Sequence, residues 1–199
     1  MSTQEAAVGR RVGTRERLIA ATIELLQEGG YAAAGVNEIT GRIDVAAGTL
    51  YRHFPSKAEL FVEVFRDVCD REYQAMRHAS ETAGSAGERV DAVVEVFAER
   101  ALQNPRLAWA LLAEPVDPLV DAERLEFRRR YRDLIAGHLQ SGIDTGELPA
   151  QNAKLVAAAL VGAIGDGLVS PLAPSESSPE NRASVIAELQ RFCRRAIGT

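Results

Sequence analysis

The residues best suited to chemistry lie in one short stretch near the N-terminus. Thr49, Tyr51, Arg52 and His53 carry a hydroxyl, a phenol, a guanidinium and an imidazole, and Lys57 follows at the first turn of the next expected helix. A short helix that enters the major groove of DNA uses such groups to contact phosphates and base edges. The spacing alone is equally compatible with a solvated helical surface, so both interpretations are open at this point.

The elements that position these residues are expected to be helices. Apolar residues recur with helical periodicity, and no stretch shows the sustained alternation of a strand. We therefore predict an all-α fold with helices over about 14–30, 36–43, 47–53, 56–80, 88–103, 106–113, 119–141, 151–169 and 180–197. The expected domains are a flexible arm over 1–12, a helix-turn-helix over 13–55 and a ligand-binding and dimerisation domain over 56–199.

Local signals mark several helix ends. Thr14 fits the N-cap of the first helix, and Gly29 and Gly30 fit its end. Ser56 with Glu59 three residues later fits a capping box. The helix that follows would run on the order of 35 Å, which is enough to join two domains rigidly.

Composition favours a soluble, cytoplasmic protein. The chain has 199 residues, of which 46% are hydrophobic and 26% charged, and its formal net charge is −5. The longest apolar run, Leu155–Gly165, is broken by Asp166 and is shorter than the roughly 20 residues that span a bilayer. The polar N-terminus offers no secretory signal. Four arginines near the N-terminus have only one acidic residue among them in the sequence: Arg10, Arg11, Arg15 and Arg17. This cluster indicates that one end of the molecule faces an anion.

The segment Asp44–Leu60 identifies a family resemblance. It reads DVAAGTLYRHFPSKAEL. It resembles the DNA-binding domain of the tetracycline-repressor (TetR) family, whose pattern is approximately Gly-Val-Ser-x-Gly-Thr-Leu-Tyr-x-His-Phe-x-Ser-Lys-x-x-Leu. The resemblance covers Leu18–Phe61, whereas residues 62–199 resemble the family only in the order of their helices.

The resemblance implies a set of DNA contacts. Thr49, Tyr51, His53 and Lys57 match positions that contact operator phosphates or groove edges, and Asn37 matches a DNA-facing position on the preceding helix. The full set of residues that we expect at DNA is Arg15, Asn37, Ala46, Ala47, Gly48, Thr49, Tyr51, Arg52, His53 and Lys57.

The segment departs from the family pattern in three ways. Asp44 replaces the turn glycine, and Asp tolerates a positive φ better than most residues. Ala46 replaces the usual Ser, so the recognition helix is expected to lack a side-chain N-cap. Ala47 and Gly35 occupy positions where longer side chains often touch DNA. These changes put the operator sequence in doubt and shift weight to Arg52, Asn37 and the arginines of the N-terminal arm.

The second domain contains candidates for an effector site and a dimer interface. The aromatic and apolar residues of its middle helices either pack a core or line a cavity for a hydrophobic or aromatic effector. These are Phe65, Phe97, Trp109, Leu112, Phe127 and Tyr131. The family layout implies that the last two helices form the interface of a homodimer. The residues expected there are Leu160, Ile164, Ile186, Leu189 and Phe192.

Other clusters have structural explanations. Arg128–Arg130 share a helix with acidic residues at pairing distances, which favours a self-paired solvated face. Cys69 and Cys193 form no Cys-x-x-Cys motif and are expected to pack as small apolar side chains. The histidines are isolated. We therefore expect no catalytic residues, no metal and no cofactor.

The function that these observations favour is regulation of transcription. We expect a homodimer that binds a palindromic operator, acts as a repressor and is released by a small effector. The alternatives are a small-molecule-binding protein or enzyme with a non-functional helix-turn-helix, and a regulator that binds protein instead of DNA.

Overall fold

The computed structural model describes residues 13–173 and 182–199, and these ranges fold as an all-α protein. The helices are α1 (Thr14–Ala33), α2 (Val36–Arg42), α3 (Ala47–His53), α4 (Lys57–Glu81), α5 (Ala86–Gln103), α6 (Pro105–Leu112), α7 (Pro118–Thr145), α8 (Ala153–Leu172) and α9 (Arg182–Ile197). Within the described residues, the predicted order of helices is confirmed. The arm predicted over residues 1–12 lies outside the described residues.

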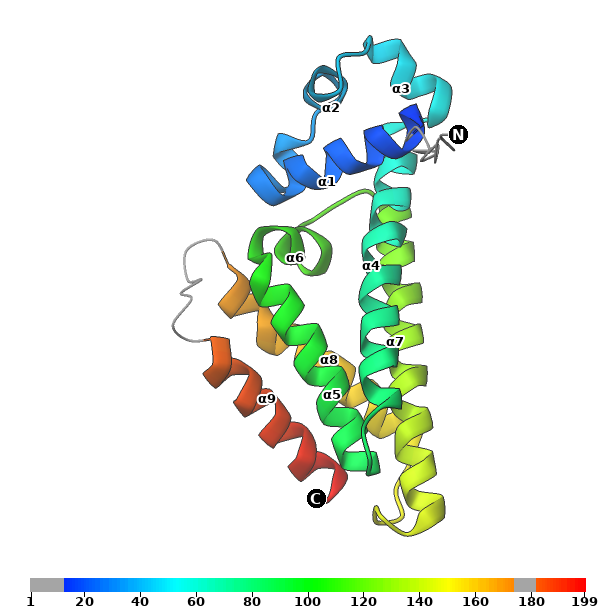
Figure 1. Cartoon of the computed structure of the whole chain (residues 1–199), viewed down its shortest axis with the longest axis vertical. Helices are drawn as coiled ribbons and strands as arrows, with labels where there is room; N and C mark the ends of the chain where they lie inside the picture. Colours follow the sequence, from blue (N-terminus) through cyan, green and yellow to red (C-terminus); the bar gives the residue numbers. More distant parts are fainter. Residues whose placement is uncertain (1–12, 174–181) are drawn as a thin grey trace, which may run out of the picture.

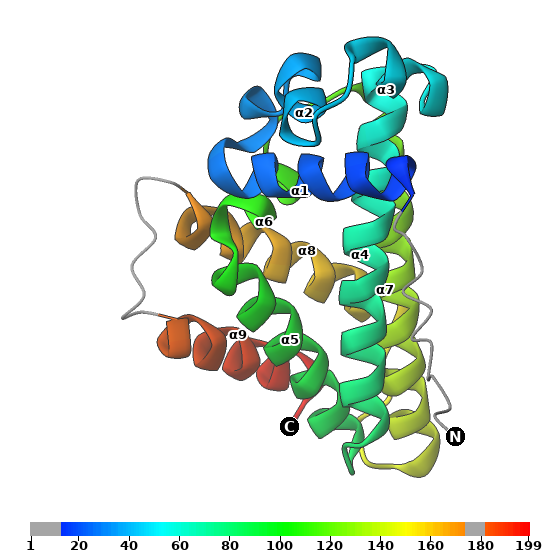
Figure 2. The same cartoon turned by 45° about the horizontal axis from the view of Figure 1, so that its top comes forward.

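The helices form two ends of one elongated molecule. Helix α1 and the short helices α2 and α3 make up one end, and α4 lies side by side with α7 along the long axis (Figure 1). Helices α5, α8 and α9 pack beside this pair, and α6 lies against α1 (Figure 2). The connector α4 therefore joins the two ends, as its length predicts.

Two clusters of buried apolar side chains stabilise this arrangement. One cluster is built mainly by α5, α7, α8 and α9. The other lies between α1–α3 and the adjoining parts of α4, α6 and α7, and it joins Leu50 to Phe61 and Phe127. Tyr131 packs against both clusters. The boundary expected at residue 55 thus falls inside one continuous core.

Helix ends agree only partly with the local signals. The prediction for Thr14 is wrong, because Gly13 is the N-cap of α1 and gives no side-chain bond. Gly30 has φ 69° and kinks α1, which then continues for one short turn to Ala33. Ser56 accepts a hydrogen bond from the Glu59 amide (3.1 Å), which is one half of the predicted capping box.

Helix α8 is longer than expected. Asp166 is exposed and does not end the helix, which continues to Leu172 with Pro171 inside its last turn. By length and composition alone, α8 is therefore apolar enough to cross a membrane, in contrast to the expectation from the shorter run. The core helix of a soluble protein passes the same test, so this property is weak evidence.

Candidate nucleic-acid interface and ligand cavity

A tight turn at Asp44 joins α2 to α3. Asp44 has φ 55° and is the one non-glycine residue with a positive φ in the described parts of the chain. Its N–H donates to the Gly41 carbonyl (3.2 Å), and the Val45 N–H donates to the Thr40 carbonyl (3.0 Å). Asp adopts this conformation more readily than most residues because its short polar side chain bonds locally. The expectation that Asp44 takes the place of a turn glycine is confirmed.

Helix α3 presents unpartnered polar groups to solvent. Leu50 is fully buried and anchors the helix, whereas Tyr51 is 53% exposed. Arg52 and His53 are also exposed, and none of these three side chains has a hydrogen-bond or ion-pair partner among the described residues. Ala46 precedes the helix without a side-chain cap, as expected. The outer face of α3 is therefore free to bind a partner.

The surroundings of α3 leave room for close approach. A Cβ atom added at Gly48 would meet no atom within 4 Å. Thr49 and Ala47 are half-buried, and Asn37 on α2 is exposed. The contacts of all these residues with DNA stay predictions.

Two of the expected DNA ligands contact other parts of the protein. Arg15 forms an ion pair with Glu63 on α4. The Lys57 ammonium lies 4.7 Å from the ring centre of Tyr31 and 5.1 Å from that of Phe61. Burial lowers the pKa of Lys57. Both cations are thus engaged within the protein, a feature that the sequence did not predict.

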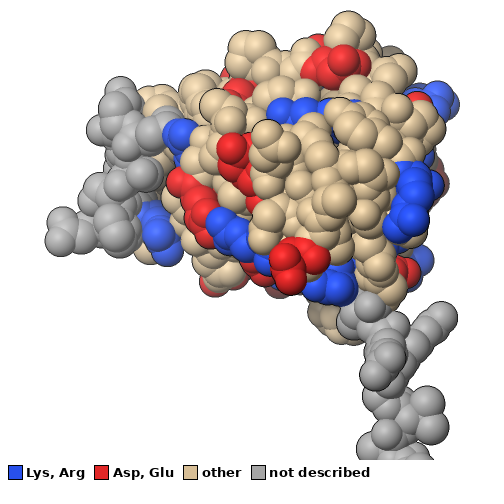
Figure 3. Space-filling model, turned by 90° about the horizontal axis from the view of Figure 1, so that it is seen from above, with Lys and Arg blue, Asp and Glu red and all other residues tan. Residues whose placement is uncertain are grey.

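The basic residues around this end are also partly neutralised. Arg17 donates to the Ile43 carbonyl (2.8 Å), and Arg42 forms a two-pronged ion pair with Glu28 (2.7 Å for each bond). Hydrogen bonding to Arg42 lowers the pKa of Glu28. Seen from the α2–α3 end, arginine and lysine side chains are interspersed with acidic ones over a mostly uncharged surface (Figure 3). The exposed polar groups of α3 therefore stand out from a weakly charged background.

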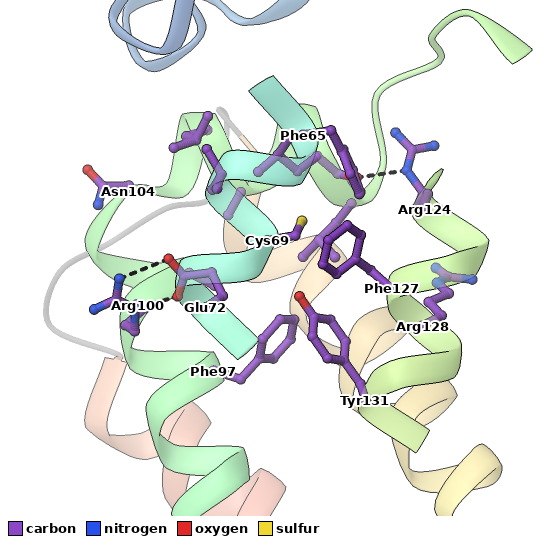
Figure 4. Close-up of a pocket in the computed structure, with 16 residues that line it drawn as sticks. Phe65, Cys69, Glu72, Phe97, Arg100, Asn104, Arg124, Phe127, Arg128 and Tyr131 are labelled. Carbon is purple, nitrogen blue, oxygen red and sulfur yellow. Dashed lines mark hydrogen bonds and ion pairs between the residues drawn. The ribbon is translucent and has the colours of Figure 1, made fainter. Parts of the chain in front are cut away.

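A cavity lies between α4, α5, α6 and α7 in the other part of the molecule. It is a half-open hollow, and its empty space is about 660 Å³ when the open solvent at its mouth is counted. Phe65, Phe97, Phe127, Tyr131 and Leu112 line it, so five of the six residues expected at an effector site meet there (Figure 4). Their binding of an effector stays a prediction.

The sixth residue, Trp109, does not line the cavity. Helix α6 turns Leu107, Ala108, Leu111 and Leu112 toward the cavity. Trp109 lies on a different side of α6 and packs against the cluster built by α5, α7, α8 and α9. The structure therefore does not bring Trp109 together with the other five residues, and the helical period of α6 explains the difference.

Most polar groups in the cavity wall are neutral or paired; the exception among the described residues is Arg128, which is exposed and unpaired. Arg100 forms an ion pair with Glu72 (Nη2 to Oε1, 3.0 Å). Burial raises the pKa of the Cys69 thiol to about 12 and raises the pKa of the neighbouring Tyr131 hydroxyl. Both groups keep their protons at neutral pH, and a protonated thiol is a poor nucleophile. The arrangement is suited to binding an apolar molecule.

Arg124 joins the cavity wall to the C-terminal end of α6. Its Nε donates to the Leu111 carbonyl (2.7 Å), and its Nη2 donates to the Glu114 carbonyl (3.1 Å). Its Nη1 pairs with Asp121 (2.7 Å). Burial lowers the pKa of Arg124, and the like charge of Arg128 adds to the effect. With a longer bond from Nη2 to the Ala110 carbonyl (3.5 Å), this guanidinium ties four backbone and side-chain groups around the cavity.

Two long-range hydrogen bonds connect α6 and the loop after it to α1. The Tyr31 N–H donates to the Glu114 carboxylate (3.0 Å), and Arg106 donates to the Gly29 carbonyl (3.0 Å). Gly30 has φ 69° and ψ −162°, a conformation that L side chains rarely adopt, so the position favours glycine. Residues on the two sides of the junction are about 80 apart in the chain, and no local signal predicted the contact.

A second half-open cavity adjoins the first, with about 460 Å³ of empty space when open solvent is counted. The two share Phe97, Leu112, Arg128 and Tyr131 in their walls. The far wall of the second cavity is formed by α8, through residues that include Gly165.

The expected dimer interface needs correction at two positions. Leu160 and Ile164 are 1% and 5% exposed and belong to the chain's own core. Ile186 and Leu189 are half-buried against the same core. Phe192 is 48% exposed, and apolar Leu155 on α8 is 67% exposed. The helical period turns Leu160 and Ile164 inward and leaves the opposite side of α8 uncovered.

Comparison with protein families finds two matches along the chain. Residues 18–64 match the bacterial regulatory proteins, tetR family. Residues 83–166 match the tetracyclin repressor-like C-terminal domain. Together the two matches cover the helix-turn-helix and most of the helices that form the cavities.

Curated relatives are regulators of transcription. The HTH-type transcriptional activator FasR of Mycolicibacterium smegmatis is 30% identical over 150 residues, which cover 74% of this chain and 67% of the relative. The HTH-type transcriptional repressor KstR of the same organism is 34% identical over 101 residues, which cover 49% of this chain and 48% of KstR. The chain thus spans about half the length of KstR.

Solved structures share the fold. FadR from Bacillus subtilis, in complex with stearoyl-CoA, has a TM-score of 0.74 and 21% identity, and covers 87% of this chain and 96% of that protein. FadR from Bacillus halodurans has a TM-score of 0.76 and 18% identity, and covers 92% and 98%. At these identities the likeness concerns the fold.

Proposed function

The chain belongs to the tetR family of bacterial regulatory proteins, and we propose that it is a homodimeric, cytoplasmic repressor released from a palindromic operator by an apolar effector. The observation that carries this proposal is the outer face of α3. Tyr51, Arg52 and His53 are exposed there without protein partners. Unpaired hydrogen-bonding groups on a helix-turn-helix are the groups that DNA satisfies.

The proposed dimer interface uses the uncovered sides of α8 and α9. Leu155 and Phe192 expose large apolar surfaces, and Ala159 and Gly162 continue the exposed side of α8. Small residues allow two helices to approach closely, and an isologous contact of this kind closes a two-fold dimer. Such a dimer would place two α3 helices about 34 Å apart, one helical turn of DNA.

The proposed effector binds in the apolar cavities. The relative FadR was solved with stearoyl-CoA, which makes long-chain acyl compounds the first class to test on this chain. An effector against α6 would act on the helix-turn-helix through two routes. One route is α4, and the other is the pair of hydrogen bonds from Arg106 and Glu114 to the kinked end of α1.

The sign of regulation is proposed as repression. The relatives include both a repressor and an activator. A regulator that dissociates when its effector binds blocks transcription from the operator until then. By linkage, the effector and the operator weaken each other's affinity by the same factor, typically 5- to 150-fold.

The test is selection of bound sequences from a random DNA duplex pool, with salt titration of the selected sequence. A palindromic consensus is expected, with an affinity that falls steeply with salt as phosphate contacts are screened. Sedimentation of the same preparation reports the dimer. Failure of a folded dimer to enrich any sequence would overturn the proposal and favour the alternative, a small-molecule-binding protein whose helix-turn-helix is non-functional.

A further inference from the structure

Arg15, on the first turn of α1, lies beside the C-terminal end of α3. Its guanidinium carbon is 5.1 Å from the ring centre of Phe54, the residue that follows His53 at the end of that helix. The first turn of α1 also lies next to the start of α4 (Figure 1). Arg15 is therefore close to the exposed groups of α3 that we propose at DNA.

Only part of the Arg15 guanidinium is bound within the protein. Its Nη2 donates to Oε2 of Glu63 on α4, whereas Nε and Nη1 have no hydrogen-bond partner in the described parts of the chain. The Arg15 side chain is 45% exposed. A guanidinium presents five N–H groups in one rigid plane, so a phosphate can bind the unoccupied edge while Glu63 holds the other.

Glu63 is held at both of its carboxylate oxygens. Its Oε1 accepts a hydrogen bond from Nη1 of Arg66, one turn further along α4 (3.0 Å). Arg66 in turn pairs through Nη2 with Glu123 on α7. Four side chains of alternating charge thus form one row that runs from α7 across α4 to α1, namely Glu123, Arg66, Glu63 and Arg15.

This row restrains Arg15 more than an isolated surface pair would. Isolated exposed ion pairs contribute little because two flexible side chains must be ordered for one contact, whereas a network shares its partners. The two carboxylates are the least exposed members of the row, with 29% of the Glu63 side chain and 18% of the Glu123 side chain accessible. Hydrogen bonding to Arg15 lowers the pKa of Glu63, so this carboxylate is charged at neutral pH. The row therefore orders Arg15 before a partner binds.

We propose that Glu63 is a positioning residue of the DNA interface, which through Arg15 presents the free edge of a guanidinium to an operator phosphate. The inference rests on the proposed function, because it needs a bound DNA backbone. Ordering a flexible arginine in advance reduces the entropy that is lost on binding. The opposite role, in which Glu63 occupies Arg15 in place of a phosphate, predicts the opposite change in the same experiment.

The first test is the operator affinity of Glu63→Ala, measured by fluorescence anisotropy with the selected operator. Removing a negative charge near DNA strengthens binding in general, so a weakening has to come from the lost position of Arg15. We expect a weakening of about three- to fivefold, the upper range for an exposed ion pair. Glu63→Gln keeps an acceptor oxygen and should lose less.

Glu59→Ala is the matched control for the loss of charge. Glu59 is exposed on α4, one turn nearer to α3 than Glu63, and its side chain has no hydrogen bond or ion pair with a described residue. This variant should bind the operator at least as tightly as the original protein. An equal weakening in Glu59→Ala would overturn the inference.

A double-mutant cycle tests whether Glu63 acts through Arg15. Arg15→Ala alone should weaken binding more than Glu63→Ala does, because the phosphate contact itself is lost. In the Arg15→Ala protein, Glu63→Ala should cause no further weakening. Glu123→Ala, two links away, should weaken binding about twofold and only when Arg15 is present. Its control is Glu126→Ala, since Glu126 pairs with Arg129 on the same helix.

A second measurement needs no DNA. Nuclear magnetic relaxation of the arginine Nε–H groups in the full-length protein reports how ordered each side chain is. Arg15 should be ordered in the original protein and in Glu59→Ala, and mobile in Glu63→Ala. A mobile Arg15 in the original protein would overturn the inference.

Failure of this inference and failure of the proposed function give different results. Operator binding that is unchanged or stronger in Glu63→Ala, or a weakening that persists without Arg15, would overturn the positioning role and leave the regulator intact. Failure of the folded dimer to select any DNA would overturn the proposed function and the inference with it, whatever the order of Arg15.

Discussion

The DNA-binding end and the cavity end of this molecule are built by different kinds of contact. At the first end, Leu50 and Ile39 are both fully buried and lie 11 positions apart in one continuous segment. At the second, Phe65, Phe97 and Tyr131 come from three helices spread over more than 60 residues. A site made by residues that are close in sequence can be recognised as a motif. A cavity is represented in the sequence only by scattered apolar residues.

The largest effect is expected on the stability of the DNA-binding end, where one buried side chain anchors α3. Leu50→Ala removes methyl groups from a fully buried position and should lower the free energy of unfolding by about 2–5 kcal/mol. Urea denaturation measures the change. Leu125→Ala on α7, which is 66% exposed, is the control and should change stability by less than about 0.5 kcal/mol. Equal losses in both variants would contradict the assignment of Leu50 to a core.

A double substitution should separate the two ends functionally. Tyr51→Ala combined with Arg52→Ala removes two exposed groups of α3 and should weaken operator binding on the order of 100-fold or more. Ligand affinity and sedimentation should stay unchanged, because neither side chain contacts another described residue through a hydrogen bond or ion pair. Fluorescence anisotropy with labelled operator gives the affinity. Arg129→Ala, exposed on α7, serves as the control, and full operator affinity in the double variant would remove α3 from the interface.

The hydrogen bonds that join α1 to α6 and the loop after it should control the coupling between effector binding and operator binding. Glu114→Gln weakens the acceptor of the Tyr31 N–H, a charge-assisted bond worth about 1.5–3 kcal/mol when intact. We expect the factor by which effector weakens operator binding to fall at least threefold, while each ligand alone binds within about twofold of the original affinity. Operator titrations with and without effector measure this factor. Glu126→Gln is the control, and unchanged coupling in Glu114→Gln would leave α4 as the sole route.

The smallest effect is expected at the turn before α3. Asp44→Gly relieves the positive φ but adds freedom to the unfolded chain, so stability should change by less than about 1 kcal/mol. Loss of a carboxylate near the proposed phosphates should raise operator affinity a few-fold, most clearly at low salt. Asp44→Asn should give the same gain because it removes only the charge. A gain in the glycine variant alone would point to backbone flexibility.

The sequence predicted local structure well wherever the deciding contacts are short in range. The bounds of α3, Ala47–His53, and the unusual turn at Asp44 followed from a motif in which each residue depends on near neighbours. Thr14 was misassigned because a capping residue and a first helical residue look alike without their dihedral angles.

Prediction from the sequence was less accurate where packing between helices decides which side of a helix is buried. Leu160 and Ile164 are apolar, as the residues of a dimer interface are. Only the packing of α8 shows that they face the core of the chain itself. The Arg128–Arg130 run paired within its helix as expected at Arg129 and Glu126. Arg130 instead reaches Asp70 on α4 (2.6 Å), a contact that no periodicity on one helix predicts.

The glycine kink that meets Glu114 has a consequence for protein engineering. Hybrid regulators are made by grafting one DNA-reading module onto a different sensor module. A graft cut at residue 55 of this chain would carry Gly29, Gly30 and Tyr31 but leave behind Arg106 and Glu114. Such a hybrid would lack one of the two proposed routes between the inducer and the operator and would keep only the route through α4. A responsive biosensor would need both sides of this junction to be transferred together.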